Sequence, residues 1–541
     1  MRTSTALLAS LALATPAIAQ DRVAAADPMA SLVPSDAFFV ARVTSYDAFQ
    51  AMAGEIVEAF APGEESPDVA ELLPLDADLF AKNMPMTMAA SLRSGQPVVT
   101  MILPALDPAS VVAAVEAEDR PGVTRTSGNY VGICEGSQYE VGGSSLLSSM
   151  QPGQVAMRLD LAPVMEAFGP MIDMGMDQVR MMAEAEAGDQ EMPMDMDMEV
   201  MLDFYFDSFE SFMDSAEIVD MGFELRDGML TLNGGLDVAE GSDMAGFGSA
   251  AKANFAPVAS RLGSGGMGTF LMGLDYADYE RLAGGMMNEL LLMYPESMRT
   301  GLEATMNGYA EMMKACEPGI AMRFDMRQGM QMGMVAQAKE QAAAVLPKGR
   351  EIIQAMSMQE MGYSMTEVSE ATVSGVAGFR SSLDMDFEKL LASMGEEAGA
   401  AMDVAEFEKM MQVMYGGNTV PIWYGAMDKI LLGAFGNGEG LAEQVVARAK
   451  AADAAPAPML SWAMEQVGGR TPSAAMNMDF VTLLRQAESI VKQFDENAES
   501  LPEDLPASVP IAQFFLIENL RWSMGARMPL AAFGELVRSL D

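Results

Sequence analysis

A short pattern recurs five times along the chain: alternating strand-forming residues run into one capping residue, and an apolar helical stripe follows. Four copies have an aspartate at the capping position, and the first copy has a serine. Both residue types are preferred helix N-caps because their side-chain oxygens accept hydrogen bonds from the free amides of the first turn. The pattern therefore predicts five capped strand-to-helix junctions, at Ser45, Asp160, Asp275, Asp384 and Asp479.

The spacing of these junctions indicates a duplicated unit. Successive capping residues are 115, 115, 109 and 95 residues apart, which is longer than the repeat of an ordinary solenoid. Two-residue turns at Ser94-Gly95, Asp227-Gly228 and Gln328-Gly329 lie between apolar strands and predict hairpins, hence antiparallel pairing. We expect an α+β fold of repeated antiparallel hairpin-plus-helix units that form sheets with helices packed on one face.

Composition shifts divide the chain into predicted segments. Two stretches are acidic and interrupted by glycine or proline, as exposed loops often are. The predicted segments are a signal peptide (1–19), a first αβ unit (20–175), an acidic methionine-rich linker (176–200), a second αβ unit (201–360), a third αβ unit (361–493), and an acidic proline-containing loop with a C-terminal strand-helix segment (494–541).

The first nineteen residues have the three parts of a secretory signal: Arg2, an apolar run from Ala6 to Ala14, and the small-residue cleavage site Ala17-Ile18-Ala19. No later stretch has the roughly 18 uninterrupted apolar residues that a spanning helix needs. We expect an exported protein, periplasmic or extracellular, with no transmembrane segment after cleavage.

The charge balance excludes one class of partner. The chain has 32 Lys and Arg against 77 Asp and Glu, a net charge of −45. Nucleic-acid binding needs clustered basic residues that neutralise phosphates, and docking on anionic lipid needs a polybasic patch. We therefore expect no nucleic-acid partner and a surface kept hydrated by like charge.

The chain contains no histidine, the commonest general base and metal ligand. Ser-His-Asp and Cys-His nucleophiles and histidine-based metal sites are excluded. We expect no enzymatic activity and no cofactor, although a carboxylate-dependent hydrolase stays open as a distant alternative. In an oxidising compartment Cys134 and Cys316 either form a disulfide or stay as two separate buried thiols.

Methionine is abundant, with 55 residues, and Met192, Met194, Met196 and Met198 alternate with acidic residues or proline. Thioethers are soft ligands that suit Cu(I) and Ag(I), and in a strand the alternation would place all four on one side. The competing interpretation is that methionine replaces leucine throughout this chain as flexible core filler.

A glycine-rich stretch at 436–440 lies between an apolar strand and a helix, where phosphate loops also lie. It lacks the Lys-Ser/Thr of such a loop, and Glu439 would repel an anion. We interpret the stretch as a strand-to-helix turn.

The opening LVPSDAFFVARVTSYDAF (Leu32–Phe49), followed by an apolar hairpin and a helix, resembles a loose group of uncharacterised exported bacterial proteins that begin with an L-P-x-D-x strand-helix segment. The resemblance covers about the first 150 residues and implies no catalytic or binding residue. The leading hypothesis is a periplasmic binding or interaction protein that presents an apolar surface or groove to a partner protein or lipid-like ligand. The alternative is a methionine-rich buffer for Cu(I) or Ag(I).

Overall fold

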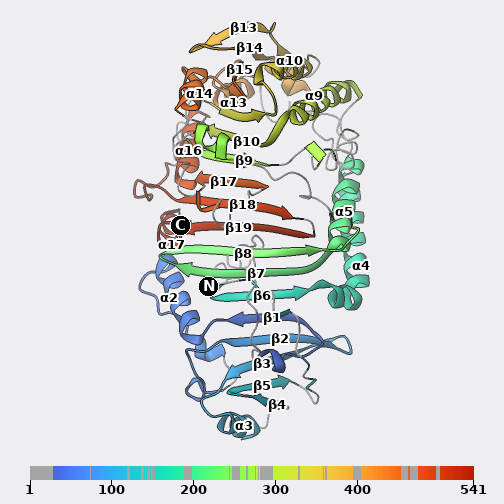
Figure 1. The fold of residues 1–541 in the computed structure, drawn as a ribbon, viewed down its shortest axis with the longest axis vertical. Helices are drawn as coiled ribbons and strands as arrows, with labels where there is room; N and C mark the ends of the chain where they lie inside the picture. The colour runs from blue at the N-terminus through green and yellow to red at the C-terminus, as the bar shows by residue number, and fades with distance from the viewer. Residues whose placement is uncertain are drawn as a thin grey trace.

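One continuous antiparallel sheet contains all nineteen strands that the structure describes (Figure 1). From one end to the other the strands are ordered β4-β5-β3-β2-β1-β6-β7-β8-β19-β18-β17-β9-β10-β11-β16-β15-β14, and β12 and β13 both pair with the outer edge of β14. The computed structural model describes residues 28–72, 75–117, 122–135, 139–140, 142, 146–147, 150–151, 153–187, 198–242, 244–245, 256–262, 266–273, 276–277, 280, 291, 296–326, 329–357, 359, 362–393, 404–451, 461–463, 473–494, 500–518 and 520–540.

The sheet is built from five copies of one unit, in which an opening strand leads to one or more helices and then to a hairpin. The first unit has β1 (Ala37–Val43), α2 (Tyr46–Phe60), β2 (Met86–Arg93), β3 (Gln96–Pro104) and α3 (Pro108–Ala117). The second has β6 (Val155–Asp160), α4 (Leu161–Ala187), α5 (Met198–Ser215), β7 (Ala216–Arg226) and β8 (Met229–Val238). The third has β9 (Gly268–Met272), α9 (Glu296–Ala315), β10 (Cys316–Asp325), β11 (Gln331–Ala338) and α10 (Leu346–Ala355). The fourth has β14 (Val376–Met385), α11 (Phe387–Ser393), α13 (Val404–Tyr415), β15 (Thr419–Met427), β16 (Ile430–Phe435) and α14 (Leu441–Lys450). The fifth has β17 (Ala474–Asp479), α16 (Phe480–Phe494), β18 (Pro510–Glu518), β19 (Arg521–Pro529) and α17 (Leu530–Leu540).

Shorter elements flank these units. Strands β4 (Gly122–Ser127) and β5 (Tyr130–Glu135) extend the sheet beyond β3, and β12 (Tyr363–Met365) and β13 (Ser369–Val373) extend it beyond β14. Helix α6 (Ala256–Leu262) precedes β9. The described 3-10 turns are Ala30–Leu32, Val69–Leu72, Ala77–Leu79 and Ala342–Ala344.

Neighbouring units join through equivalent strands. Opening strands pair at β1 with β6 and at β9 with β17, whereas closing strands pair at β8 with β19 and at β11 with β16. The order of units across the sheet is therefore first, second, fifth, third and fourth. Figure 1 shows this directly, since the red strands β17 to β19 lie between the green strands β8 and β9.

The predicted α+β class and antiparallel repeat are confirmed, and so are two hairpin turns. The turn residues Ser94 and Gly95 have φ of 52° and 75°, and Asp227 and Gly228 have 54° and 71°. Positive φ at both central positions is the geometry whose twist matches that of two antiparallel strands. The glycine-rich stretch at 436–440 is the turn between β16 and α14, as expected.

Helices cover both faces of the sheet in its second half, which differs from the predicted single covered face. Val335 of β11 packs with α6 and α14, whereas the next residue, Ala336, packs with α9 and α10. Successive strand residues point to opposite faces. Strand β16, ILLGAF, is buried at five of its six positions and needs cover on both sides.

Three of the predicted caps are confirmed. The Ser45 side chain accepts from the Ala48 amide at 3.0 Å, Asp160 from the Ala162 amide at 3.1 Å, and Asp479 from the Val481 amide at 3.0 Å. Asp275 lies outside the described residues. Asp384 is wrong as a cap, because β14 continues to Met385 and the Asp384 carboxylate accepts instead from the Thr419 hydroxyl.

The cap of α11 is Asp386, whose carboxylate accepts from the Lys389 amide at 3.2 Å. We expect Asp386→Ala to lower the free energy of local opening of α11 by about 1 kcal/mol, the usual value of such a cap. The matched variant Asp384→Ala loses only an exposed hydrogen bond and should cost less. Amide hydrogen exchange of residues 387–393 measures both; a larger effect from Asp384→Ala would contradict the assignment.

The predicted segments do not coincide with the units of the sheet. The boundary at 175/176 falls inside α4, so residues 176–187 of the predicted linker are helical. The boundary at 493/494 falls at the last residue of α16 and separates this helix from the hairpin β18–β19 of the same unit. Acidic, proline-containing stretches lie within units here, so composition alone does not mark unit boundaries. The predicted signal peptide lies outside the described residues.

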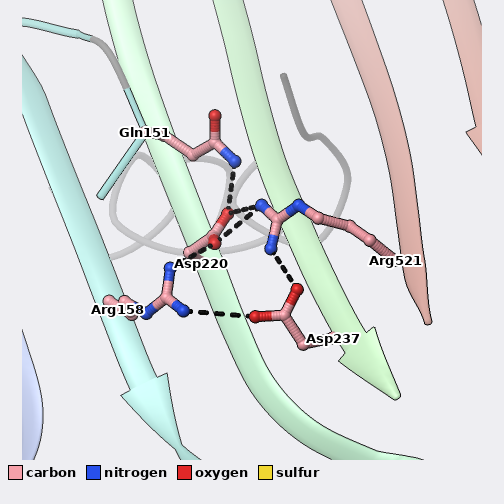
Figure 2. A network of polar contacts seen from close by, with 5 residues as sticks. All are labelled: Gln151, Arg158, Asp220, Asp237 and Arg521. Atoms are coloured by element: carbon pink, nitrogen blue, oxygen red, sulfur yellow. Dashed lines mark hydrogen bonds and ion pairs between the residues drawn. The ribbon is translucent and has the colours of Figure 1, made fainter. Parts of the chain in front are cut away.

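A buried ionic network joins the second unit to the fifth across the β8–β19 junction (Figure 2). The Asp220 carboxylate, fully buried, accepts from Gln151 Nε2 at 2.6 Å, Arg158 Nη1 at 3.1 Å and Arg521 Nη2 at 2.8 Å. Asp237 also accepts from both arginines. Burial alone would lower the pKa of Arg521, but Asp220 and Asp237 raise it above its ordinary value.

Gly235 makes room for this network. It pairs with Asp220 on one side and Ser523 on the other. A Cβ atom at this position would collide with the Arg521 guanidinium and the Asp220 carboxylate. The missing side chain thus lets Arg521 reach across β8, over 301 residues of sequence.

Candidate functional site

The second unit differs from the others in the link between its opening strand and its hairpin. Helices α4 and α5 lie together beside the strand ends on the right of Figure 1. We call residues 161–215 the helical arm; residues 188–197, between the two helices, lie outside the described part of the chain. Within α4 the only described residues that are buried are Leu161 and Gly169, so most of the helix is solvated.

Large apolar side chains are concentrated on the exposed surface of the helical arm. Of the sixteen exposed large apolar side chains among the described residues, eight lie here, although the arm is about one tenth of the chain. Their exposed fractions run from 38% to 66%. They are Met171, Met174, Val179, Met181, Met182, Tyr205, Phe209 and Phe212. An exposed apolar concentration of this kind marks an interaction surface more often than chance exposure does.

A groove of about 400 Å³ runs between the two helices of the arm. Its apolar lining includes Met165, Ile172, Met176, Phe206, Phe209 and Met213. Helical spacing explains this lining, since residues three and four apart share a helix face. The Arg180 guanidinium lies 5.5 Å from the centre of the Phe206 ring, a cation–π distance.

The polar residues around the groove are almost all acidic. Asp173, Asp177, Glu210 and Asp214 line it, and Arg180 is the one basic lining residue described. Residues 161–215 contain fourteen acidic residues and a single arginine. The arm is thus an apolar, methionine-rich surface inside a strongly negative field.

Methionine has both of the roles considered from the sequence. Met29, Met312 and Met528 are buried in core clusters, which supports the interpretation of methionine as core filler. On the arm, Met171 and Met174 are 59% and 66% exposed and fill no core. The sequence does not separate these two roles, since Met385 lies between Asp384 and Asp386 and is nevertheless buried in a core cluster.

The predicted soft-metal ligands remain a prediction. Met192, Met194 and Met196 lie outside the described residues, and Met198 is the first residue of α5. Within the part of the chain that the structure describes, no three His, Cys, Asp or Glu side chains gather as metal ligands would.

Of the two alternatives for the cysteines, the disulfide is wrong, because Cys134 and Cys316 are both free and buried. Cys134 lies in β5, near one end of the sheet, and Cys316 begins β10, in its other half (Figure 1). Burial raises the pKa of the Cys316 thiol to about 11, so it stays protonated. The alternative of two separate buried thiols is confirmed.

The chain was compared with protein-family models, curated proteins and solved structures. No protein-family model matches the chain, and no curated protein matches it. Among solved structures the chain is similar to TP0453 in crystal forms III and I, at TM-scores of 0.23 and 0.22 and 8% and 9% identity. These matches cover 54% of this chain and 100% and 99% of TP0453, and TM-scores so low carry no argument about function. None of the described helices is both long enough and apolar enough to cross a bilayer.

Proposed function

We propose that the chain is an exported, non-enzymatic binding protein whose helical arm docks a basic amphipathic segment of a partner protein. The observation that carries this proposal is the concentration of eight exposed large apolar side chains on an arm with fourteen acidic residues and one arginine. The proposal of export is supported by the signal-like start of the sequence, and the proposal that the protein is not an enzyme is supported by the missing histidine.

Two properties of the arm favour this class of partner. Methionine side chains are flexible and polarisable, so they adapt to different apolar helix faces in a groove. The acidic rim attracts lysine and arginine beside that apolar face, which speeds encounter and selects against acidic partners. An anionic lipid surface would be repelled by the same charges, so a peptide segment fits better than a membrane.

A peptide titration tests the proposal. A labelled amphipathic peptide of lysine and leucine, about 18 residues long and therefore about five helical turns, should bind the full chain in fluorescence anisotropy. A peptide of the same pattern with glutamate for lysine should not bind. Binding of the basic peptide should weaken as salt screens the acidic rim.

Matched variants locate the site. Phe209→Ser combined with Phe212→Ser should weaken binding about tenfold or more, since central aromatic residues supply much of the affinity of such interfaces. Val491→Ser combined with Leu520→Ser changes side chains of similar exposure elsewhere, 51% and 39%, and should leave binding unchanged. Equal loss in both variants, or equal binding of both peptides, would refute docking on the arm. Tighter binding to neutral lipid vesicles than to the basic peptide would identify a lipid-like ligand instead.

A further inference from the structure

A second cavity lies on the opposite half of the molecule from the helical arm, between α6 and α14 and over strands β10 and β11. It encloses about 450 Å³, a size typical of sites for small molecules. Its lining residues are Arg261, Leu262, Arg323, Asp325, Gln331, Gly333, Val335, Glu439, Leu441, Gln444, Val445 and Arg448. We call this cavity the arginine pocket.

Three guanidinium groups in one cavity are unusual for this chain, which has fewer than half as many basic as acidic residues. Arg261 comes from α6, Arg323 from β10 and Arg448 from α14. Guanidinium groups hold carboxylates and phosphates well, because their planar donors match two oxygens at once.

Two of these arginines are fixed in place by the helix ends. Arg261 Nη1 donates to the carbonyl of Ala449 at 2.7 Å, and Arg448 Nη1 donates to the carbonyl of Leu262 at 3.5 Å. Each helix therefore supplies an arginine to the C-terminal end of the other. A guanidinium has five N–H donors, so one such bond leaves most of its donors open to a ligand.

The fixed arginines have no carboxylate partner among the described residues. Neither Arg261 nor Arg448 forms an ion pair with a described acidic residue, and the buried Nε of Arg261 has no described hydrogen-bond partner. Burial lowers the pKa of Arg448 from its ordinary value, which shows that its charge is partly desolvated. Both arginines are partly buried, and even a partly desolvated charge is costly to leave without a partner.

The two acidic lining residues do not neutralise this pair. Asp325 accepts from Gln486 Nε2 at 3.3 Å and lies 4.0 Å from Arg323, so its charge offsets that arginine. Glu439 belongs to the glycine-rich turn before α14 and lines the same pocket, but it forms no ion pair with Arg261 or Arg448. Three guanidinium groups against two carboxylates leave an excess of one positive charge.

We propose that the arginine pocket binds a small organic anion whose oxyanion group lies between Arg261 and Arg448 and whose apolar part contacts Leu262, Val335 and Val445. The oxyanion is a carboxylate or a phosphate, since the same donors serve both. Glu439 would repel an anion bound by the backbone amides of its own glycine-rich turn, as in a phosphate loop. Here the donors come from α6 and the C-terminal part of α14.

Calorimetric titration of the full chain tests this site with hexanoate, hexyl phosphate and inorganic phosphate, and with hexanol as the neutral control. We expect hexanoate, hexyl phosphate or both to bind with a dissociation constant below about 1 mM, and hexanol to bind at least tenfold more weakly. Binding of hexanoate alone would identify carboxylates as the ligand class, and binding of hexyl phosphate with inorganic phosphate would identify phosphates. If neither hexanoate nor hexyl phosphate binds, or if hexanol binds as tightly as they do, the proposal is overturned.

Variants assign the binding to the pocket. Arg448→Gln should weaken anion binding about tenfold, as expected for loss of a charge-assisted hydrogen bond. Arg538→Gln, at an exposed residue of α17, should leave it unchanged. If Arg448→Gln does not fold, Gln444→Glu places a new carboxylate on the exposed rim without touching the core and should also weaken binding. Unchanged binding in the folded variant refutes the site.

Discussion

Replacing Asp220 with alanine is expected to lower the free energy of opening of the central strands by about 3–5 kcal/mol, the usual cost of removing one partner from a buried ion pair. The Asp220 carboxylate is fully buried and accepts from Arg158, Arg521 and Gln151. Without it the two guanidinium groups lose their fully buried partner, and the other carboxylate of the network, Asp237, is 26% exposed. Amide hydrogen exchange of β6, β7, β8 and β19 measures the change locally, since 541 residues need not unfold in one step.

Two further variants serve as controls for Asp220→Ala. Asp237→Ala removes a partly exposed carboxylate from the same arginines and should cost less than Asp220→Ala. Asp78→Ala breaks an ion pair with Lys82 in which the Asp78 side chain is 85% exposed, and it should leave exchange unchanged. An Asp220→Ala protein with wild-type exchange in β8 and β19 would show that the network does not hold the second and fifth units together.

Local patterns in the sequence predict the unit well, because its signals lie within a few residues of one another. All five copies of the strand-to-helix pattern correspond to opening strands, β1, β6, β9, β14 and β17. The one misplaced cap shows the limit of such patterns. Asp384 and Asp386 both precede α11, and only the extension of β14 to Met385, which pairs with Tyr363 of β12, decides between them.

The order of the units cannot be predicted in the same way. Each unit has an opening edge and a closing edge, and nothing in the local pattern states which edges join. The placement of the fifth unit between the second and third depends on contacts such as Arg521 with Asp220, which are 301 residues apart. Pairings at this distance are decided by the packing of the whole sheet.

The candidate sites show the same division between local and distant information. The helical arm follows from local features, since its methionines, aromatic residues and acidic residues all lie within 161–215. The arginine pocket gathers Arg261, Arg323 and Arg448 from three elements, and no sequence spacing links them. The sequence shows that basic residues are scarce, but it does not indicate that these three arginines lie together.

Deleting the fifth unit, residues 473–541, is expected to split the sheet rather than shorten it. The unit pairs through β19 with β8 over nine residue pairs and through β17 with β9 over five. Its removal leaves β8, of ten residues, and β9, of five, as unpaired edges in the middle of the sheet, and such edges promote association between molecules. We expect two separately unfolding halves and self-association, measured by scanning calorimetry and sedimentation.

A deletion at the end of the sheet is the matched control. Removing residues 28–150 takes away more of the chain, but it removes β1 to β5 from one end of the sheet and keeps Gln151. The strands that follow in the sheet, from β6 at the new edge to β14 at the other end, stay paired as before. That protein should keep one continuous sheet with a single new edge and should associate less. If the protein without 473–541 stays monomeric and unfolds in one transition, β8 pairs directly with β9. The fifth unit is then not the element that joins the two halves.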